Sequence, residues 1–219
     1  MGNLPVPPEV LFLSLSGRGP SDYTPLLSEI PKQFRLIHIH EAPDALEVLK
    51  ASQPRAVIIT DEGISKQENL EVLEQVVKYV KDGGLAIVAG YWFSVDVVLG
   101  STGDPRPFFD AFDLPWEAGN SHTYSLWIFN KNCSLPDGAR ITWVPDTCAM
   151  SILSLKNVGP DERIYVPYEQ AGLEPPPDVT EAAVAGAHVG NGYFAYVGDL
   201  NWVMRSELLV LALLGVGNS

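Results

Sequence analysis

The chain has 219 residues, 46% hydrophobic and 19% charged, which is the composition of a globular protein long enough to bury a real core. Its 14 basic and 27 acidic residues leave a net charge of -13. This charge argues against binding to nucleic acid or to an anionic membrane, since both need a basic surface. We expect no secretory signal and no transmembrane span. Two cysteines, Cys133 and Cys148, make no disulfide framework, so a cytoplasmic location is expected.

The first 90 residues alternate apolar runs of strand length with helical patterns. Strands are predicted at residues 10–15, 34–40, 56–60 and 85–89, and helices at 23–30, 43–51 and about 68–81. The third helix is the best defined, because it combines an apolar stripe with early glutamates and late lysines, which suit the helix dipole. Gly83 and Gly84 are expected to end it. Repeated strand–helix units predict a parallel, doubly wound sheet, with ligand sites at the carboxyl ends of its strands.

The second half has a different pattern, in which short strands are separated by turn residues. Strands are predicted at 125–129, 140–144, 163–166, 182–187 and 193–197, and a short apolar piece lies at 108–112. Asn191-Gly192 predicts a hairpin between the last two strands. The final helix, at about 204–214, is apolar nearly all round, so it is buried against a sheet or in a dimer contact. We expect one domain over residues 1–219: a three-layer α/β fold with a mainly parallel sheet and a hairpin-rich second half.

Three segments resemble the class I glutamine amidotransferase-like superfamily. They are TDEG at 60–63, GGLAIVAGYWFS at 83–94, and GNGYFAYVGDLNW at 190–202 followed by the apolar helix. The resemblance implies a flavodoxin-like or amidotransferase-like architecture, in which the fourth strand leads into the turn that holds the nucleophile. In amidotransferases this nucleophile is the cysteine of a Gly-x-Cys-x-Gly turn, and a His-x-Glu pair follows a late strand.

The chain departs from the superfamily at these catalytic positions. Trp92 stands where the cysteine would be, and Ser94 replaces the second glycine. The stretch at 198–201 contains no histidine. A thiol glutaminase needs a thiolate and a base in contact. The resemblance therefore implies a degenerate member that lacks the Cys-His-Glu triad.

Polar and aromatic side chains are expected to converge at the carboxyl edge of the parallel strands. The catalytic candidates are Asp61, Glu62, Ser94 and His40, and the ligand-binding candidates are Ser16, Arg18, Tyr91, Trp92, Asp199 and Asn201. Asp61 and Glu62 could act as a general base or bind a ligand, or simply begin a helix, where acids are favoured. Tyr91 and Trp92 could stack on a ligand or a protein partner, or pack over the strand end. Asp199 could belong to a site or cap the last helix.

Neither a metal site nor a cofactor site is assigned from the sequence. His38 and His40 lie on one face of a strand, but a metal would need a third ligand from elsewhere, such as His188 or Asp61. The Ser16–Gly19 loop lacks the spacing of a phosphate-binding loop or a dinucleotide fingerprint.

Three functions are compatible with these patterns. The first is a non-catalytic amidotransferase-like domain that acts as a binding or assembly module for an unknown protein partner or small molecule, and homodimerisation stays open. The second is a hydrolase that uses carboxylate or metal chemistry at the same edge. The third is a binding protein that holds an aromatic or sugar ligand on Tyr91 and Trp92.

Overall fold

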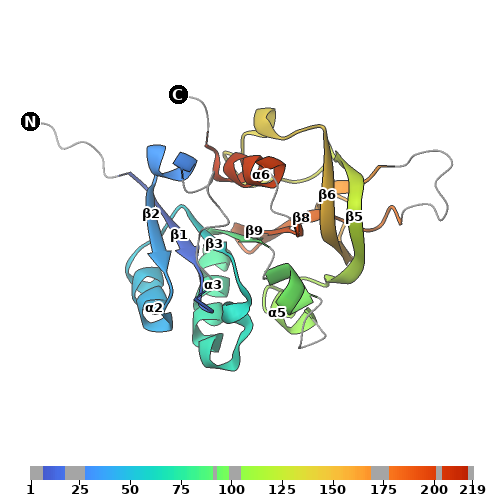
Figure 1. Cartoon of the computed structure of the whole chain (residues 1–219). Helices are drawn as coiled ribbons and strands as arrows, with labels where there is room; N and C mark the ends of the chain where they lie inside the picture. The colour runs from blue at the N-terminus through green and yellow to red at the C-terminus, as the bar shows by residue number, and fades with distance from the viewer. Residues whose placement is uncertain are drawn as a thin grey trace, which may run out of the picture.

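The computed structural model describes residues 7–17, 28–90, 93–98, 105–168, 178–200 and 204–216. The nine strands found in these residues form one sheet in the order β2-β1-β3-β4-β9-β8-β7-β5-β6. Helices lie on both sides of the first half of this sheet, and β5 and β6 form a wall at the far end (Figure 1). No helix among the described residues is long and apolar enough to cross a membrane.

The first half of the sheet is parallel. It consists of β1 (Glu9–Leu13), β2 (Arg35–Ile39), β3 (Ala56–Ile59) and β4 (Leu85–Ala89), and the late strand β9 (Gly192–Val197) pairs in parallel with β4. Every residue of β3 and β4 is buried, as expected where both faces of a parallel sheet are covered. The predicted strands of this half are confirmed, with ends that differ by one or two residues.

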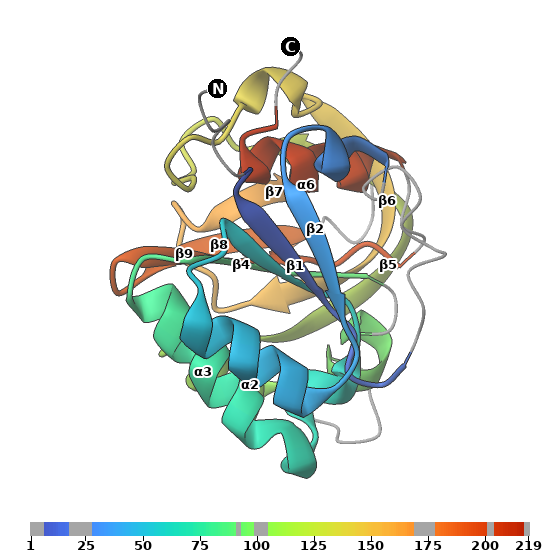
Figure 2. The same ribbon diagram turned by 90° about the vertical axis from the view of Figure 1, so that its left-hand side faces the viewer.

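Two helices of this half match their predicted positions. They are α2 (Ala42–Ala51) and α3 (Leu70–Lys81), which lie side by side under the sheet (Figure 2). Gly83 follows α3 with a φ of 116°, a backbone conformation that glycine adopts without strain, so the predicted helix end is confirmed. Most of the helix predicted at 23–30 lies outside the described residues; a 3-10 turn, η2 (Ile30–Lys32), follows it.

The second half of the sheet is antiparallel. It contains β5 (Glu117–Phe129), β6 (Thr147–Lys156), β7 (Arg163–Pro167) and β8 (Val184–Val189), and β8 forms the predicted hairpin with β9. Among the described strands, four pairings are parallel and four antiparallel. The expectation of a mainly parallel sheet is therefore wrong, and the sheet is mixed.

Two further expectations for this half are corrected. The strand predicted at 140–144 is a 3-10 turn, η6 (Ile141–Trp143), and the neighbouring strand β6 was not predicted. Ser151 and Ser154 interrupt the apolar pattern of β6 in sequence, but both are buried and bond to the backbone of β5. The apolar piece at 108–112 overlaps a short helix, α5 (Arg106–Asp110).

The antiparallel strands curl until β6 meets the connections on either side of the β8–β9 hairpin. The Leu153 N–H donates to the Gly198 carbonyl at 3.0 Å, and Leu155 exchanges backbone hydrogen bonds with Ala182. These bonds cover part of the outer edge of β6, which would otherwise expose unpaired backbone groups. The curl also brings the segment around residue 181 against β5 and β6.

Two apolar cores fill the two sides of the sheet. Residues of α2, α3 and α5 pack in one core, and α6 (Met204–Leu214) packs in the other. Leu209 through Leu214 are each at most 2% exposed within this single chain. The last helix is thus buried against its own sheet, which removes the reason for expecting a dimer contact there.

Candidate functional site

Asp61 is a predicted site residue whose two carboxylate oxygens both accept hydrogen bonds. It follows β3 and is 1% exposed. Its Oδ2 accepts from the Ser14 hydroxyl at 2.8 Å and from the Ser16 N–H at 2.9 Å, and its Oδ1 accepts from the Gly63 N–H at 3.0 Å. Both oxygens are therefore used to join the ends of β1 and β3. This matches the helix-start role that Asp61 could have from the sequence, because it caps η3 (Glu62–Ser65).

Glu62 and Ser16 form a second, more exposed layer beside Asp61. The Ser16 hydroxyl donates to Glu62 Oε1 at 2.6 Å, and the Lys66 ammonium lies 3.3 Å from the same oxygen. Burial opposes ionisation of Glu62, but the hydrogen bonds from Ser16 and Lys66 and the charge of Lys66 outweigh it and lower the pKa of the carboxyl. A carboxylate with a lowered pKa is a weak proton acceptor at neutral pH.

Gly63 explains why the two loops can approach so closely. A Cβ placed on Gly63 would lie 2.6 Å from the backbone carbon of Leu15 and from the nitrogen of Ser16. Only a residue without a side chain fits between β1 and η3 without moving the backbone. Gly63 is the last residue of the TDEG segment, one of the three segments that carry the resemblance. A glycine is therefore required there for a local steric reason.

His38 lies in β2 and His40 directly follows this strand. Among the described residues, no group of three or more histidine, cysteine or acidic side chains could hold a metal ion, so the two histidines have no third ligand there. His38 packs on the Phe12 ring with centroids 5.5 Å apart. Burial, with a contribution from the charge of His40, lowers the pKa of His38. His40 Nδ1 lies 3.4 Å from the Ser14 carbonyl oxygen.

Ser94 lies at the start of η5 (Ser94–Val98), just after β4, and is 1% exposed. The Tyr196 hydroxyl lies 3.2 Å from its Oγ and 3.1 Å from the Leu153 carbonyl oxygen. Burial raises the pKa of Tyr196 far above its usual range, so this phenol stays protonated. Tyr91 and Trp92, which precede Ser94, lie outside the described residues.

Asp199 is fully buried after β9 and accepts a hydrogen bond from the Ser206 hydroxyl in the first turn of α6. It also forms an isolated bridge with Ile152 of β6. Arg18 and Asn201, the remaining ligand-binding candidates, lie outside the described residues. The structure therefore brings Ser16, Asp61 and Glu62 together, and it places Ser94 against Tyr196 and Asp199 against α6.

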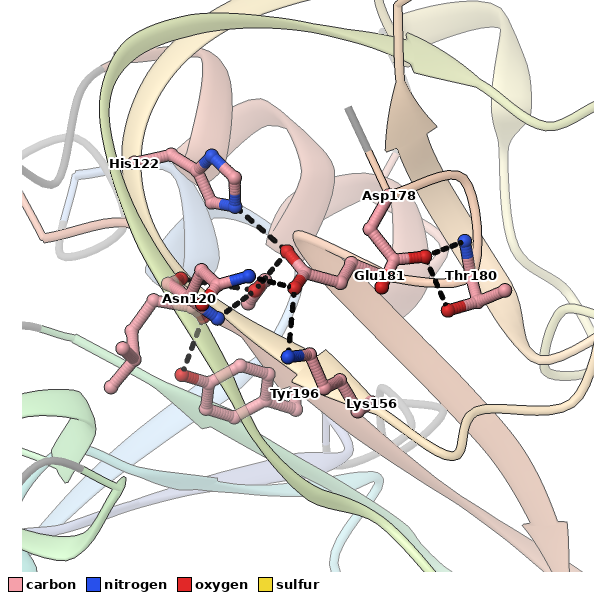
Figure 3. Close-up of polar contacts among 9 residues, drawn as sticks. Asn120, His122, Lys156, Asp178, Thr180, Glu181 and Tyr196 are labelled. Atoms are coloured by element: carbon pink, nitrogen blue, oxygen red, sulfur yellow. Dashed lines mark hydrogen bonds and ion pairs between the residues drawn. The ribbon is translucent and has the colours of Figure 1, made fainter. Parts of the chain in front are cut away.

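A polar network that sequence reasoning missed surrounds Glu181 in the antiparallel half (Figure 3). Glu181 is 0% exposed, and side chains from β5 and β6 converge on it. His122 Nε2 lies 2.7 Å from Oε2, and the Ser154 hydroxyl donates to the same oxygen at 2.7 Å. The Asn120 amide donates to Oε1, and the Lys156 ammonium lies 3.4 Å from it.

The Glu181 network fixes the segment before β8 against the wall of β5 and β6. A buried carboxylate is tolerated only when its oxygens are bonded and its charge is compensated, and here both conditions are met. In sequence, the spacing of two between Asn120 and His122, and between Ser154 and Lys156, indicates polar pairs on one face of each strand. Nothing local to Glu181 indicates that both pairs meet it, because the contact depends on the curl of the sheet.

No protein-family model matches the chain, and no curated protein matches it in sequence. Among solved structures, it is similar to a GMP synthase subunit-like protein from Thermoplasma acidophilum, with 12% identity, a TM-score of 0.52, and coverage of 95% of this chain and 93% of the other. It is also similar to the polyextremophilic β-galactosidase of the Antarctic haloarchaeon Halorubrum lacusprofundi, with 17% identity and a TM-score of 0.50. That match covers 97% of this chain and spans 30% of the β-galactosidase. At these identities, both likenesses concern the fold alone.

Proposed function

We propose that the chain is a non-catalytic domain of the class I glutamine amidotransferase-like kind, which serves as a binding or assembly module. The observation that carries this proposal is the bonding of Asp61. A general base must be within reach of a substrate proton. Asp61 is instead buried, and its two carboxylate oxygens accept hydrogen bonds from Ser14, Ser16 and Gly63.

The surrounding groups support the same conclusion. By the sequence resemblance, Trp92 stands where the amidotransferase nucleophile would be, which leaves covalent thiol chemistry without a cysteine there. Ser94 is buried, and its hydrogen-bond partner among the described side chains is the Tyr196 phenol rather than a base. Glu62 is engaged by Ser16 and Lys66, whose hydrogen bonds and charge lower the pKa of its carboxyl. A hydrolase at this edge would need at least one of these groups to be free for chemistry.

The test is a turnover assay of the purified chain with three probes: glutamine, a p-nitrophenyl ester and a p-nitrophenyl β-galactoside. We expect no turnover above that of buffer. Turnover that is lost in Asp61→Asn or Glu62→Gln, while circular dichroism shows both variants folded, would overturn the proposal. Ser94→Ala is the additional variant, because its small change tests the hydroxyl even if Asp61→Asn fails to fold.

A further inference from the structure

Exposed apolar side chains gather in the antiparallel half of the molecule. Among the described residues, six large hydrophobic side chains are exposed, and four of them belong to this half outside η6: Tyr124, Leu126, Tyr168 and Val179. The Tyr168 N–H donates to the Leu126 carbonyl at 3.0 Å, so these two residues are neighbours across β5 and the end of β7. Contiguous apolar surface of this kind marks contact sites more often than isolated exposed residues do.

Strand alternation extends this pair into a continuous surface. Ile128 pairs with Val166, two residues along from Leu126 and Tyr168, so all four side chains lie on one face of the β5–β7 pair. Trp127, between Leu126 and Ile128, points to the other face and is 1% exposed in the core with α6. We call the surface formed by Leu126, Ile128, Val166, Tyr168 and Val179 the β5–β7 outer face.

A groove runs along the β5–β7 outer face. Its volume is about 700 Å³, and Ile128, Val166, Tyr168 and Val179 line it. Its polar end carries Asp161 and Arg163, which are opposite in charge and two residues apart. The Arg163 guanidinium donates to the Val179 carbonyl through Nη1, while its Nε has no hydrogen-bond partner among the described residues.

These features select one occupant, a second copy of the same chain. In a two-fold contact, the same patch serves both copies. The charged end of one copy then lies against the charged end of the other, with the acid of each copy facing the arginine of its partner. An apolar face with one acid and one arginine at the same end is self-complementary in that arrangement. A strongly basic or acidic partner would not be matched by such a neutral pair.

We propose that the β5–β7 outer face is a two-fold homodimer interface, in which Arg163 of one copy lies against Asp161 of the other. This inference rests on the proposed assembly function and names its partner. Each copy carries a net charge of -13, so the copies repel at low ionic strength. Salt screens that repulsion and leaves the apolar contact intact, so the dimer becomes tighter as salt rises.

The experiment is sedimentation velocity of the full chain across a concentration series, in about 50 mM and about 500 mM NaCl. We expect a monomer–dimer equilibrium that shifts toward dimer at high salt. Leu126→Lys should raise the dissociation constant at least about tenfold, which corresponds to the loss of one good apolar contact. The matched control is Ile141→Lys, which alters an exposed apolar residue on η6 away from this face and should leave the constant unchanged.

A charge exchange tests the orientation of the two copies. Arg163→Asp should weaken the dimer, and adding Asp161→Arg should restore it. A monomer at every concentration and salt, or an equal loss in Ile141→Lys, would overturn the inference. A monomer without turnover would leave the proposed function standing, whereas a dimer whose turnover is lost in Glu62→Gln would overturn that function and not the interface.

Discussion

The two halves of the molecule bury a carboxylate in different ways. In the parallel half, Asp61 is bonded by a hydroxyl and two backbone N–H groups, all of them neutral donors from adjoining loops. In the antiparallel half, Glu181 is held by four side chains that include Lys156 and His122. The first arrangement joins two adjoining loops by hydrogen bonds, and the second is an ionic network between residues far apart in the sequence. The comparison teaches that buried charge here serves the architecture of each half.

Removing Glu181 should have the largest effect, because it leaves Lys156, His122, Asn120 and Ser154 without their common partner. We expect Glu181→Ala to lower the free energy of unfolding by about 3–5 kcal/mol, as for other buried ion pairs broken on one side. Urea denaturation followed by circular dichroism measures this loss. The control is Glu71→Ala, which removes an exposed surface ion pair with Lys50 and should cost about 0–1 kcal/mol; equal losses would refute the central role of Glu181.

Asp61→Ala should destabilise the chain by about 2–3 kcal/mol, because two backbone N–H groups and a hydroxyl lose their acceptor. Asp61→Asn keeps one acceptor oxygen and should cost less. The same denaturation series measures both. If neither variant differed from the parent chain, the hydrogen bonds around Asp61 would not contribute to stability, and its assignment to the architecture would fail.

Gly63→Ala should cost about 1–3 kcal/mol, because the added methyl group would be forced against the backbone of Leu15 and Ser16. Gly17→Ala is the matched control. A Cβ on Gly17 meets no atom of the described residues within 4 Å, and the position has a φ of 71°, a strain worth about 1 kcal/mol. Thermal unfolding of the two variants side by side would distinguish a packing cost from a purely conformational one.

The smallest expected effect is the pH dependence contributed by Glu62. Its folded pKa lies below the usual value of 4.5, so its contribution to stability is present above that pH and is lost as the pH falls through the folded pKa. Glu62→Gln removes this contribution. The difference in unfolding free energy between the parent chain and Glu62→Gln should therefore be constant near neutral pH and shrink below about 4.5; a difference that grows on acidification would reverse the assigned sign.

Local patterns determined much of the parallel half. The apolar runs of β1, β3 and β4 are continuous because both their faces are buried, and the stripe on α3 marks the side that packs on the sheet. The turn signal at Asn191-Gly192 likewise fixed a hairpin, since two residues of local geometry suffice for it. The same reasoning brought Ser16, Asp61 and Glu62 to one edge, because adjacent parallel strands end together.

Tertiary structure alone decided the rest. β6 was hidden in sequence, because buried serines whose hydroxyls bond to a neighbouring strand look like turn residues when read alone. Whether Asp61 was free or saturated depended on the Ser14 hydroxyl, 47 residues away. The Glu181 network required the curl of the antiparallel strands, which brings residues 59 and 61 positions apart into contact. Sequence periodicity indicates which face of a helix or strand is buried. Which residues pack against that face depends on how the strands of the sheet are arranged in the folded chain.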